Sequence, residues 1–225
     1  MDSILPWDVA AIPGFFFKFG NAALYTLYIT ALGILTGFFI GLFAAFARIS
    51  RNKIVSRIAM GYIFVIRGTP LLLQLFIIYY GLTSIVTIPP LPSAVMALGI
   101  HNGAYIAEIF RGAIVSIDWG QMEAARSLGM PYRKAMVRII LPQAFKRAVP
   151  SLGNQFIIAL KDSSLASTIA VPELLQRGRQ MASSNYMYME MLTIVAVWYL
   201  IMTSVVTFII HRIERKLKVN EREKL

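Results

Sequence analysis

The sequence predicts an all-α integral membrane protein with five transmembrane helices, its N-terminus outside the cell and its C-terminus inside. Three observations carry this prediction: the composition, the long uncharged stretches and the placement of the basic residues. Hydrophobic residues make up 57% and charged residues 15% of the 225 positions, against about 45–50% and about 25% in soluble domains. A soluble core of this size cannot hide that excess, so an ordinary water-soluble enzyme is disfavoured.

The first three spans follow from where charge is missing. Residues 19–47 contain no charged side chain, and a helix of about 20 apolar residues crosses the bilayer core, so the first span is predicted over 22–47. Residues 68–107 are also uncharged but contain Pro89-Pro90-Leu91-Pro92. Prolines break the interior of a helix, and this cluster is therefore predicted to be a turn between a second span at 56–82 and a third at 93–117.

The last two spans differ in regularity. Residues 148–171 are mostly apolar but are interrupted by Lys161-Asp162, which predicts a fourth span broken near its middle. Residues 191–211 are uncharged and predict a regular fifth span. The chain is thus expected to be a single domain, 1–225, with five spans.

The basic residues orient these spans. Of the 22 Lys and Arg, 16 lie in the segments 48–57, 119–147 and 212–224, and cytoplasmic loops carry the excess of Lys and Arg. These segments are therefore predicted to be cytoplasmic. Because the basic residues flank the spans, the formal charge of +11 is a topology signal and nucleic-acid binding is disfavoured. With no Cys and only His101 and His211, no metal site is predicted.

The segment 119–147 is too polar to span the membrane. Residues 121–128 suit a short helix, because Gly129 stands where a left-handed cap ends a helix and Pro131 follows two residues later. Taken alone, this pattern is also typical of an amphipathic loop helix resting on the membrane surface.

The spacing within that segment resembles a known family. Glu123-Ala124-Ala125, Gly129, Ile139 and Leu141-Pro142 resemble the cytoplasmic "EAA" signature of ABC importer permeases. Three more segments resemble the polar amino-acid uptake branch of that family. They are Arg67-Gly68-Thr69-Pro70-Leu71-Leu72, the third-span stretch from Ala104 to Gly112, and Lys161-Asp162-Ser163-Ser164-Leu165. The resemblance covers residues 20–212.

The resemblance implies a permease with the type I fold, located in a bacterial or archaeal cytoplasmic membrane. It implies a partner permease, either a second copy or a paralogue, together with ABC ATPase subunits and an extracytoplasmic solute-binding protein. The sequence has no G-x-x-x-x-G-K-[ST] loop, so ATP and Mg are expected on the ATPase and no cofactor or catalytic residue is expected in this chain. The residues expected to couple to the ATPase are Glu123, Ala124, Ala125, Gly129, Leu141 and Pro142.

Ionisable residues inside the membrane are costly and therefore informative. We expect structural roles for Arg67, Arg111 and Lys161: Arg67 precedes the helix-loosening Gly68-Thr69-Pro70, and Arg111 is spaced to pair with Glu108. We expect substrate contacts from Glu108 and Asp162, because carboxylates accept hydrogen bonds from ammonium and guanidinium groups. A broken helix can also offer backbone N–H groups and hydroxyls to a substrate carboxylate. The remaining substrate-binding candidates are Ser163, Ser164, Leu165, Asn102 and Asn185.

Two membrane carboxylates favour a basic amino acid (arginine, lysine or histidine), while the branch resemblance keeps a glutamine-type substrate open. The alternative is an ion-gradient-driven secondary amino-acid transporter or a channel subunit. That alternative predicts inverted internal repeats, and the sequence shows none.

Overall fold

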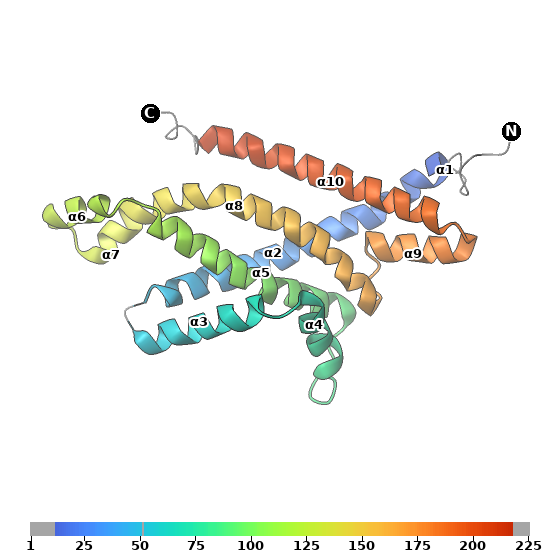
Figure 1. The fold of residues 1–225 in the computed structure, drawn as a ribbon, viewed down its shortest axis with the longest axis horizontal. Helices are drawn as coiled ribbons and strands as arrows, with labels where there is room; N and C mark the ends of the chain where they lie inside the picture. Colours follow the sequence, from blue (N-terminus) through green and yellow to red (C-terminus); the bar gives the residue numbers. More distant parts are fainter. Residues whose placement is uncertain (1–11, 51, 218–225) are drawn as a thin grey trace.

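The structure, a computed structural model, describes residues 12–50 and 52–217. Throughout these residues the secondary structure is helical and contains no strand. Four long helices run side by side (Figure 1): α2 (Gly20–Arg48), α5 (Pro90–Val115), α8 (Leu141–Asp162) and α10 (Tyr188–Leu217). The shorter helices are α1 (Ile12–Phe16), α3 (Lys53–Arg67), α4 (Leu71–Phe76), α6 (Trp119–Ser127), α7 (Tyr132–Ala135) and α9 (Leu174–Asn185).

Length and hydropathy single out the first and last long helices as membrane spans. The helical stretches Ile12–Arg48 and Tyr188–Leu217 are each long and apolar enough to cross a membrane, and a third span is present if the bent pair α3 and α4 is counted as one. The all-α membrane fold is confirmed. The count of five spans and their orientation stay predictions.

The second span is not one straight helix. Lys53–Arg67 and Leu71–Gly81 meet at an angle of 103°, so the expected local break after Arg67 is a sharp turn. Pro70 disfavours helical geometry at the residue before it, and Pro70 is itself extended, with ψ 139°. The buried amide of Gln74 donates to the carbonyls of Ile66 (2.9 Å) and Thr69 (3.1 Å), and these bonds satisfy backbone groups that the turn leaves without helical partners.

The proline cluster is not wholly a turn. Helix α5 begins at Pro90, so Pro90 and Pro92 lie inside its first turn, where the missing N–H would have had no helical acceptor. The helix therefore starts earlier than residue 93, where the third span is predicted to begin.

The fourth span tightens where we expected it to break. Helix α8 ends at Asp162 and continues as a 3-10 helix over Ser163–Ile169. The expectation that this segment frees its backbone N–H groups is therefore wrong, because i→i+3 bonds engage them. The segment ends at Ala170, whose left-handed φ of 58° turns the chain toward α9.

Helices α2 and α5 pack through small residues that sequence analysis overlooked. Gly33, Gly37 and Gly41 of α2 and Gly99 and Gly103 of α5 repeat at intervals of four. A Cβ at Gly41 would stand 2.8 Å from the carbonyl oxygen of Gly103, and one at Gly103 would stand 2.8 Å from the Tyr62 hydroxyl. Such spacing lets helix backbones approach closely in membranes.

The two ends of the bundle differ in chemistry. One end of the bundle contains α6 and α7, together with the last turns of α2 and α10 and the first turns of α3 (Figure 1). Helix α9 lies at the opposite end of the bundle (Figure 1). The three basic segments therefore share one end, as the predicted topology requires. Of the basic residues used in that prediction, Arg51, Lys218, Arg222 and Lys224 lie outside the described residues.

Candidate transport site and coupling helix

Helix α6 is fixed at both ends by capping bonds. The Asp118 carboxylate accepts the N–H of Gly120 at 2.8 Å, which is an N-cap. At the other end Gly129 has φ +78°. The N–H of Gly129 donates to the Arg126 carbonyl, and that of Met130 to the Ala125 carbonyl, at 3.0 and 3.1 Å. This is the Schellman pattern, and it confirms the predicted left-handed cap.

The two faces of α6 differ in burial. Met122 and Ala125 are buried against the chain's own core, whereas Ala124 is exposed and Leu128 is 84% exposed. Of the predicted coupling residues, Glu123, Gly129 and Pro142 are also exposed and Leu141 is half-buried. Ala125 therefore packs inward, and close approach by a partner would fall to Ala124. Leu128 was missed because its exposure depends on the tertiary fold.

The segment that follows α6 is tied back to the bundle. The Arg147 guanidinium of α8 donates to the Ser116 carbonyl, just beyond α5, and to the Ser116 hydroxyl at 3.1 Å. This contact joins the end of α5 to the first turns of α8, and so fixes α6 and α7 relative to both helices.

Asp162 is the acidic group at the tightened segment. Its side chain is half-buried, and no hydrogen-bond donor reaches its carboxylate among residues 12–50 and 52–217. The Ser163 and Ser164 hydroxyls donate to the Leu160 and Lys161 carbonyls, at 2.8 and 2.7 Å, and keep lone pairs as acceptors. Ser163 is buried, Ser164 and Leu165 are half-buried, and Lys161 is exposed.

The tightened segment is anchored at its far side by Glu173, whose anchoring role the sequence did not reveal. Glu173 is fully buried. Its carboxylate caps α9, accepting the N–H groups of Leu175 (2.9 Å) and Gln176 (2.6 Å) and the Tyr199 hydroxyl (3.0 Å). Glu173 lies between the predicted fourth and fifth spans. Burial raises the pKa of its carboxyl to about 7, while the backbone N–H groups, Tyr199 and the Arg179 charge lower it.

The neighbouring backbone is anchored as well. The N–H of Leu174 donates to the Thr26 hydroxyl of α2 at 2.9 Å. The Tyr199 hydroxyl belongs to α10, so residues 173–174 are held by two long helices at once.

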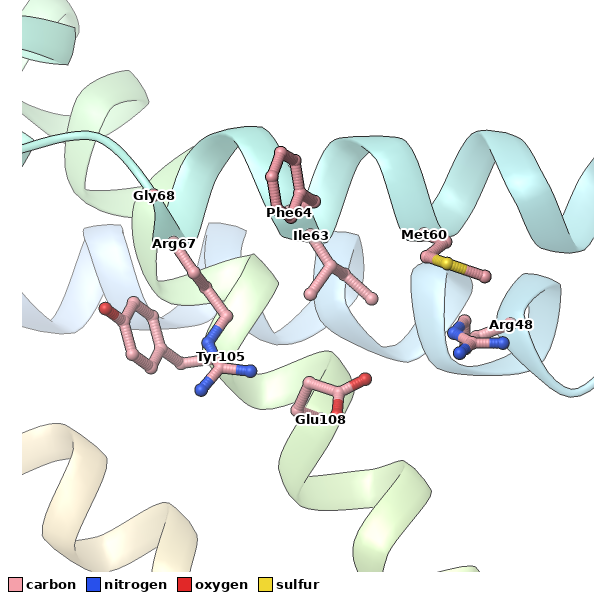
Figure 2. A pocket seen from close by; sticks show the side chains of 8 residues that line it. All are labelled: Arg48, Met60, Ile63, Phe64, Arg67, Gly68, Tyr105 and Glu108. Atoms are coloured by element: carbon pink, nitrogen blue, oxygen red, sulfur yellow. The ribbon is translucent and has the colours of Figure 1, made fainter.

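A second polar site lies toward the basic end of the bundle. An open cavity of about 460 Å³ is bounded by α2, α3 and α5. In Figure 2 the Arg67 side chain reaches from the end of α3 toward Tyr105 and Glu108, while Arg48 lies at the other end of the cavity. The Arg67 guanidinium lies over the Tyr105 ring, 5.1 Å from its centroid. The remaining lining is Met60, Ile63, Phe64 and Gly68.

Glu108 is already paired. The Arg111 guanidinium donates to both of its carboxylate oxygens at 2.9–3.1 Å, a bidentate arrangement. The predicted pairing three residues apart on one helix is confirmed. The Glu108 carboxylate is therefore less available to a substrate than the Asp162 carboxylate.

The contact between Asn102 and Gln155 shows that the carboxylates of Glu108 and Asp162 lie at different levels along the bundle. The Gln155 amide of α8 donates to the Asn102 carbonyl oxygen of α5 at 2.8 Å. From this contact Glu108 is six residues further along α5 and Asp162 seven residues further along α8. Because the Arg147–Ser116 contact shows these helices to be antiparallel, the carboxylates lie about 20 Å apart along the bundle, at 1.5 Å per residue.

The two asparagine candidates differ in surroundings. Asn102 is fully buried, and its amide also donates to the Leu98 carbonyl at 2.8 Å. Asn185 is exposed at the end of α9, where it donates to the Met181 carbonyl at 2.9 Å. Each is thus engaged by hydrogen bonds within the chain.

Fold and site together define a class: an all-helical, multi-pass membrane subunit with a capped loop helix. The family model described as "Binding-protein-dependent transport system inner membrane component" matches residues 37–219. The chain belongs to this family, as an amino-acid permease with the fold of type I ABC importers.

Individual relatives and solved structures agree with this family assignment. The glutamine transport system permease protein GlnP of Escherichia coli K12 is 43% identical over 202 residues, covering 88% of this chain and 92% of the relative. The arginine transport system permease protein ArtQ of Bacillus subtilis is 38% identical over 198 residues, covering 87% and 90%. A crystal structure of an amino acid ABC transporter with histidines superposes with a TM-score of 0.89 at 39% identity, covering 94% of this chain and all of that one. These relatives are transport subunits and not enzymes.

Proposed function

We propose that this chain forms half of the translocation pathway of an ATP-driven importer for polar or basic amino acids, and that α6 couples it to an ATPase subunit. The observation that carries the coupling role is the geometry of α6, which is capped at both ends and presents Ala124 and Leu128 outward. A helix held in this way transmits motion as a rigid body. A partner permease, ATPase subunits and an extracytoplasmic solute-binding protein complete the proposed complex.

We propose that the Asp162 carboxylate accepts hydrogen bonds from the cationic group of the substrate. Asp162 lies at the junction of α8 and the 3-10 segment, and its carboxylate has no donor among the described residues. A buried or half-buried carboxylate is stabilised by hydrogen-bond donors that carry positive charge. The side-chain ammonium or guanidinium group of a basic substrate supplies such donors, with the Ser164 hydroxyl oxygen as a neighbouring acceptor. Arginine, lysine and histidine have an additional cationic or titratable group and are the favoured substrates.

Uptake into proteoliposomes containing the full complex tests this proposal. We expect uptake of labelled arginine that requires ATP inside the vesicles and survives collapse of ion gradients. Competition by glutamine with none by arginine would reject the basic-substrate assignment. Uptake that follows an ion gradient without ATP would reject the ABC mechanism in favour of a secondary transporter.

Two isosteric variants separate the carboxylates. Asp162→Asn is expected to weaken arginine uptake much more than glutamine uptake, because only arginine loses a charge-assisted bond. Glu108→Gln, which disturbs a pair already formed with Arg111, is expected to weaken both alike. Equal losses of both substrates in Asp162→Asn would assign Asp162 a structural role.

A further inference from the structure

The cavity between α3 and α5 is lined by charged residues that are too costly to expose to lipid. Arg67 and Glu108 fall within the predicted second and third spans, and Arg67 is exposed on the surface of the chain. An arginine facing hydrocarbon at the centre of a span costs about 2.5–3.5 kcal/mol on insertion scales. Such residues face a polar interior instead. This side of the bundle therefore borders water or another polar surface.

The charges in the cavity do not cancel. Glu108 is neutralised by Arg111 at 2.9 Å. Arg67 makes no ion pair within the described part of the chain, and the Arg48 guanidinium has the Ser56 hydroxyl as its hydrogen-bond partner at 3.4 Å. Glu108 also attracts Arg67 and Arg48, but this one carboxylate faces those two guanidinium groups in addition to that of Arg111, so the cavity keeps a net positive charge, with Arg67 and Arg48 on either side of Glu108 (Figure 2). An anion is the ligand that this distribution favours.

Arg67 is held in place by an aromatic contact. Its guanidinium lies over Tyr105, and the Tyr105 ring contacts the His101 ring with centroids 5.1 Å apart. His101 Nδ1 lies 3.1 Å from Gln74 Oε1, and Gln74 bonds the carbonyls of the bend between α3 and α4. The orientation of Arg67 therefore depends on the geometry of that bend.

We propose that the cavity lined by Arg48, Arg67, Tyr105 and Glu108 is an inner subsite of the transport pathway, in which the guanidinium groups bind the carboxylate of the passing amino acid. The inference rests on the proposed transport function and adds a second binding position to it. A volume of about 460 Å³ is within the range of about 300–1,000 Å³ of small-molecule pockets. The cavity lies about 20 Å from Asp162 along the bundle. One substrate molecule would therefore bind first at one of these two positions and then at the other.

Cysteine accessibility tests this subsite, because the sequence contains no Cys and any labelled thiol in this chain is the one introduced. Met60→Cys and Phe64→Cys place thiols on the exposed wall of the cavity. Leu200→Cys, on the exposed apolar side of α10, is the control. The complete complex in nanodiscs is treated with an anionic sulfonate and, separately, a cationic trimethylammonium methanethiosulfonate reagent, and labelling of the permease chain is followed over time.

We expect both cavity thiols to react while Leu200→Cys stays unlabelled, with the anionic reagent about tenfold faster than the cationic one, as electrostatic focusing predicts. Adding Arg67→Met should abolish that preference, whereas Arg57→Met, which removes an exposed charge outside the cavity, should leave it intact. L-arginine should slow labelling, and agmatine, which lacks the carboxylate, should not.

Three results would overturn the subsite. Cavity thiols that react no faster than Leu200→Cys would show that this face is not aqueous. Spontaneous disulfides between two permease chains would show it to be a subunit interface. If L-arginine and agmatine slow the labelling equally, the cavity does not bind the carboxylate of the substrate. ATP-driven uptake by the same preparations reports the proposed function separately, so transport with no anion preference rejects the subsite alone.

Discussion

The side-chain amide of Gln155 on α8 donates a 2.8 Å hydrogen bond to the amide oxygen of Asn102 on α5. Both residues are buried, and the Asn102 amide nitrogen bonds the Leu98 carbonyl in turn. Polar side chains that are bonded across helices inside a membrane bundle fix the register of those helices. Helices α5 and α8 are held in this way at mid-bundle, between the cavity and Asp162.

The first prediction follows from this bond. Asn102→Leu leaves the Gln155 amide buried without its acceptor, and an unsatisfied buried polar group costs about 1–3 kcal/mol. We expect a lower thermal unfolding midpoint of the purified complex, and partial recovery in the double variant Asn102→Leu/Gln155→Leu, since both polar groups are then gone. If the double variant recovers stability but not uptake, at least one of these two polar side chains serves transport beyond its part in packing.

A second prediction compares two glycines of α5. A Cβ at Gly103 would stand 2.8 Å from Ile40 Cγ2 and from the Tyr62 hydroxyl, whereas a Cβ at Gly112 would have no heavy atom within 4 Å. Gly103→Ala should destabilise the protein by about 1–3 kcal/mol through overpacking. Gly112→Ala should be neutral or stabilising by up to about 1 kcal/mol, since alanine is the better helix former. Equal unfolding midpoints for both variants would contradict close packing of α2 on α5.

Sequence patterns predicted local features of this chain better than its tertiary arrangement. The cap at Gly129 depends on residues within one turn, and the Glu108–Arg111 pair depends on a spacing of three, so both were readable. The interval of four in Gly33, Gly37 and Gly41 was also a readable signal for close helix packing, although sequence analysis did not use it.

Other features depend on residues far apart in the chain. The 103° bend after Arg67 needs Gln74 to bond the freed carbonyls, and the proline pattern alone indicates only a break. Glu173 reads as part of a polar outer segment until Tyr199 of α10 is found beside it. The predicted grouping of Glu108 with Asp162 as substrate-binding candidates could not take their depths into account, because those depend on how α5 and α8 align.

The third prediction concerns the end of α6, the proposed coupling helix. A Cβ at Gly129 would meet no atom within 4 Å, so any penalty at this position comes from its φ of +78°. A left-handed conformation costs an ordinary residue about 1–2 kcal/mol and is tolerated by asparagine. We expect Gly129→Val to lose most ATP-dependent uptake while keeping normal yield, and Gly129→Asn to retain it. Normal uptake and normal substrate stimulation of ATPase activity in Gly129→Val would contradict the coupling role of α6.

The fourth prediction concerns pH. The pKa of buried Glu173 is raised from 4.5 to about 7, so the folded chain binds this proton more tightly than the unfolded chain does. The contribution of Glu173 to stability is therefore greatest at low pH, declines as the pH rises from about 4.5 to about 7, and is constant above that. At about 1.4 kcal/mol per pKa unit, the decline amounts to at most about 3.5 kcal/mol.

Glu173→Gln keeps the size of this side chain and removes its titration. The unfolding midpoint of the variant, measured relative to wild type in the solubilised complex, should therefore rise between pH 5 and pH 7 and level off by pH 8. The comparison with wild type at each pH cancels the titration of every other group that the substitution leaves undisturbed. Tyr199→Phe serves as the comparison: it removes one donor to the Glu173 carboxylate but leaves that carboxyl titratable. Because the Tyr199 hydrogen bond lowers the pKa of Glu173, the midpoint of this variant should still decline with rising pH, and the decline should extend to a higher pH than in wild type. If the wild-type and Glu173→Gln curves run parallel from pH 5 to pH 8, the Glu173 carboxyl does not exchange its proton in this range, and burial does not govern its charge.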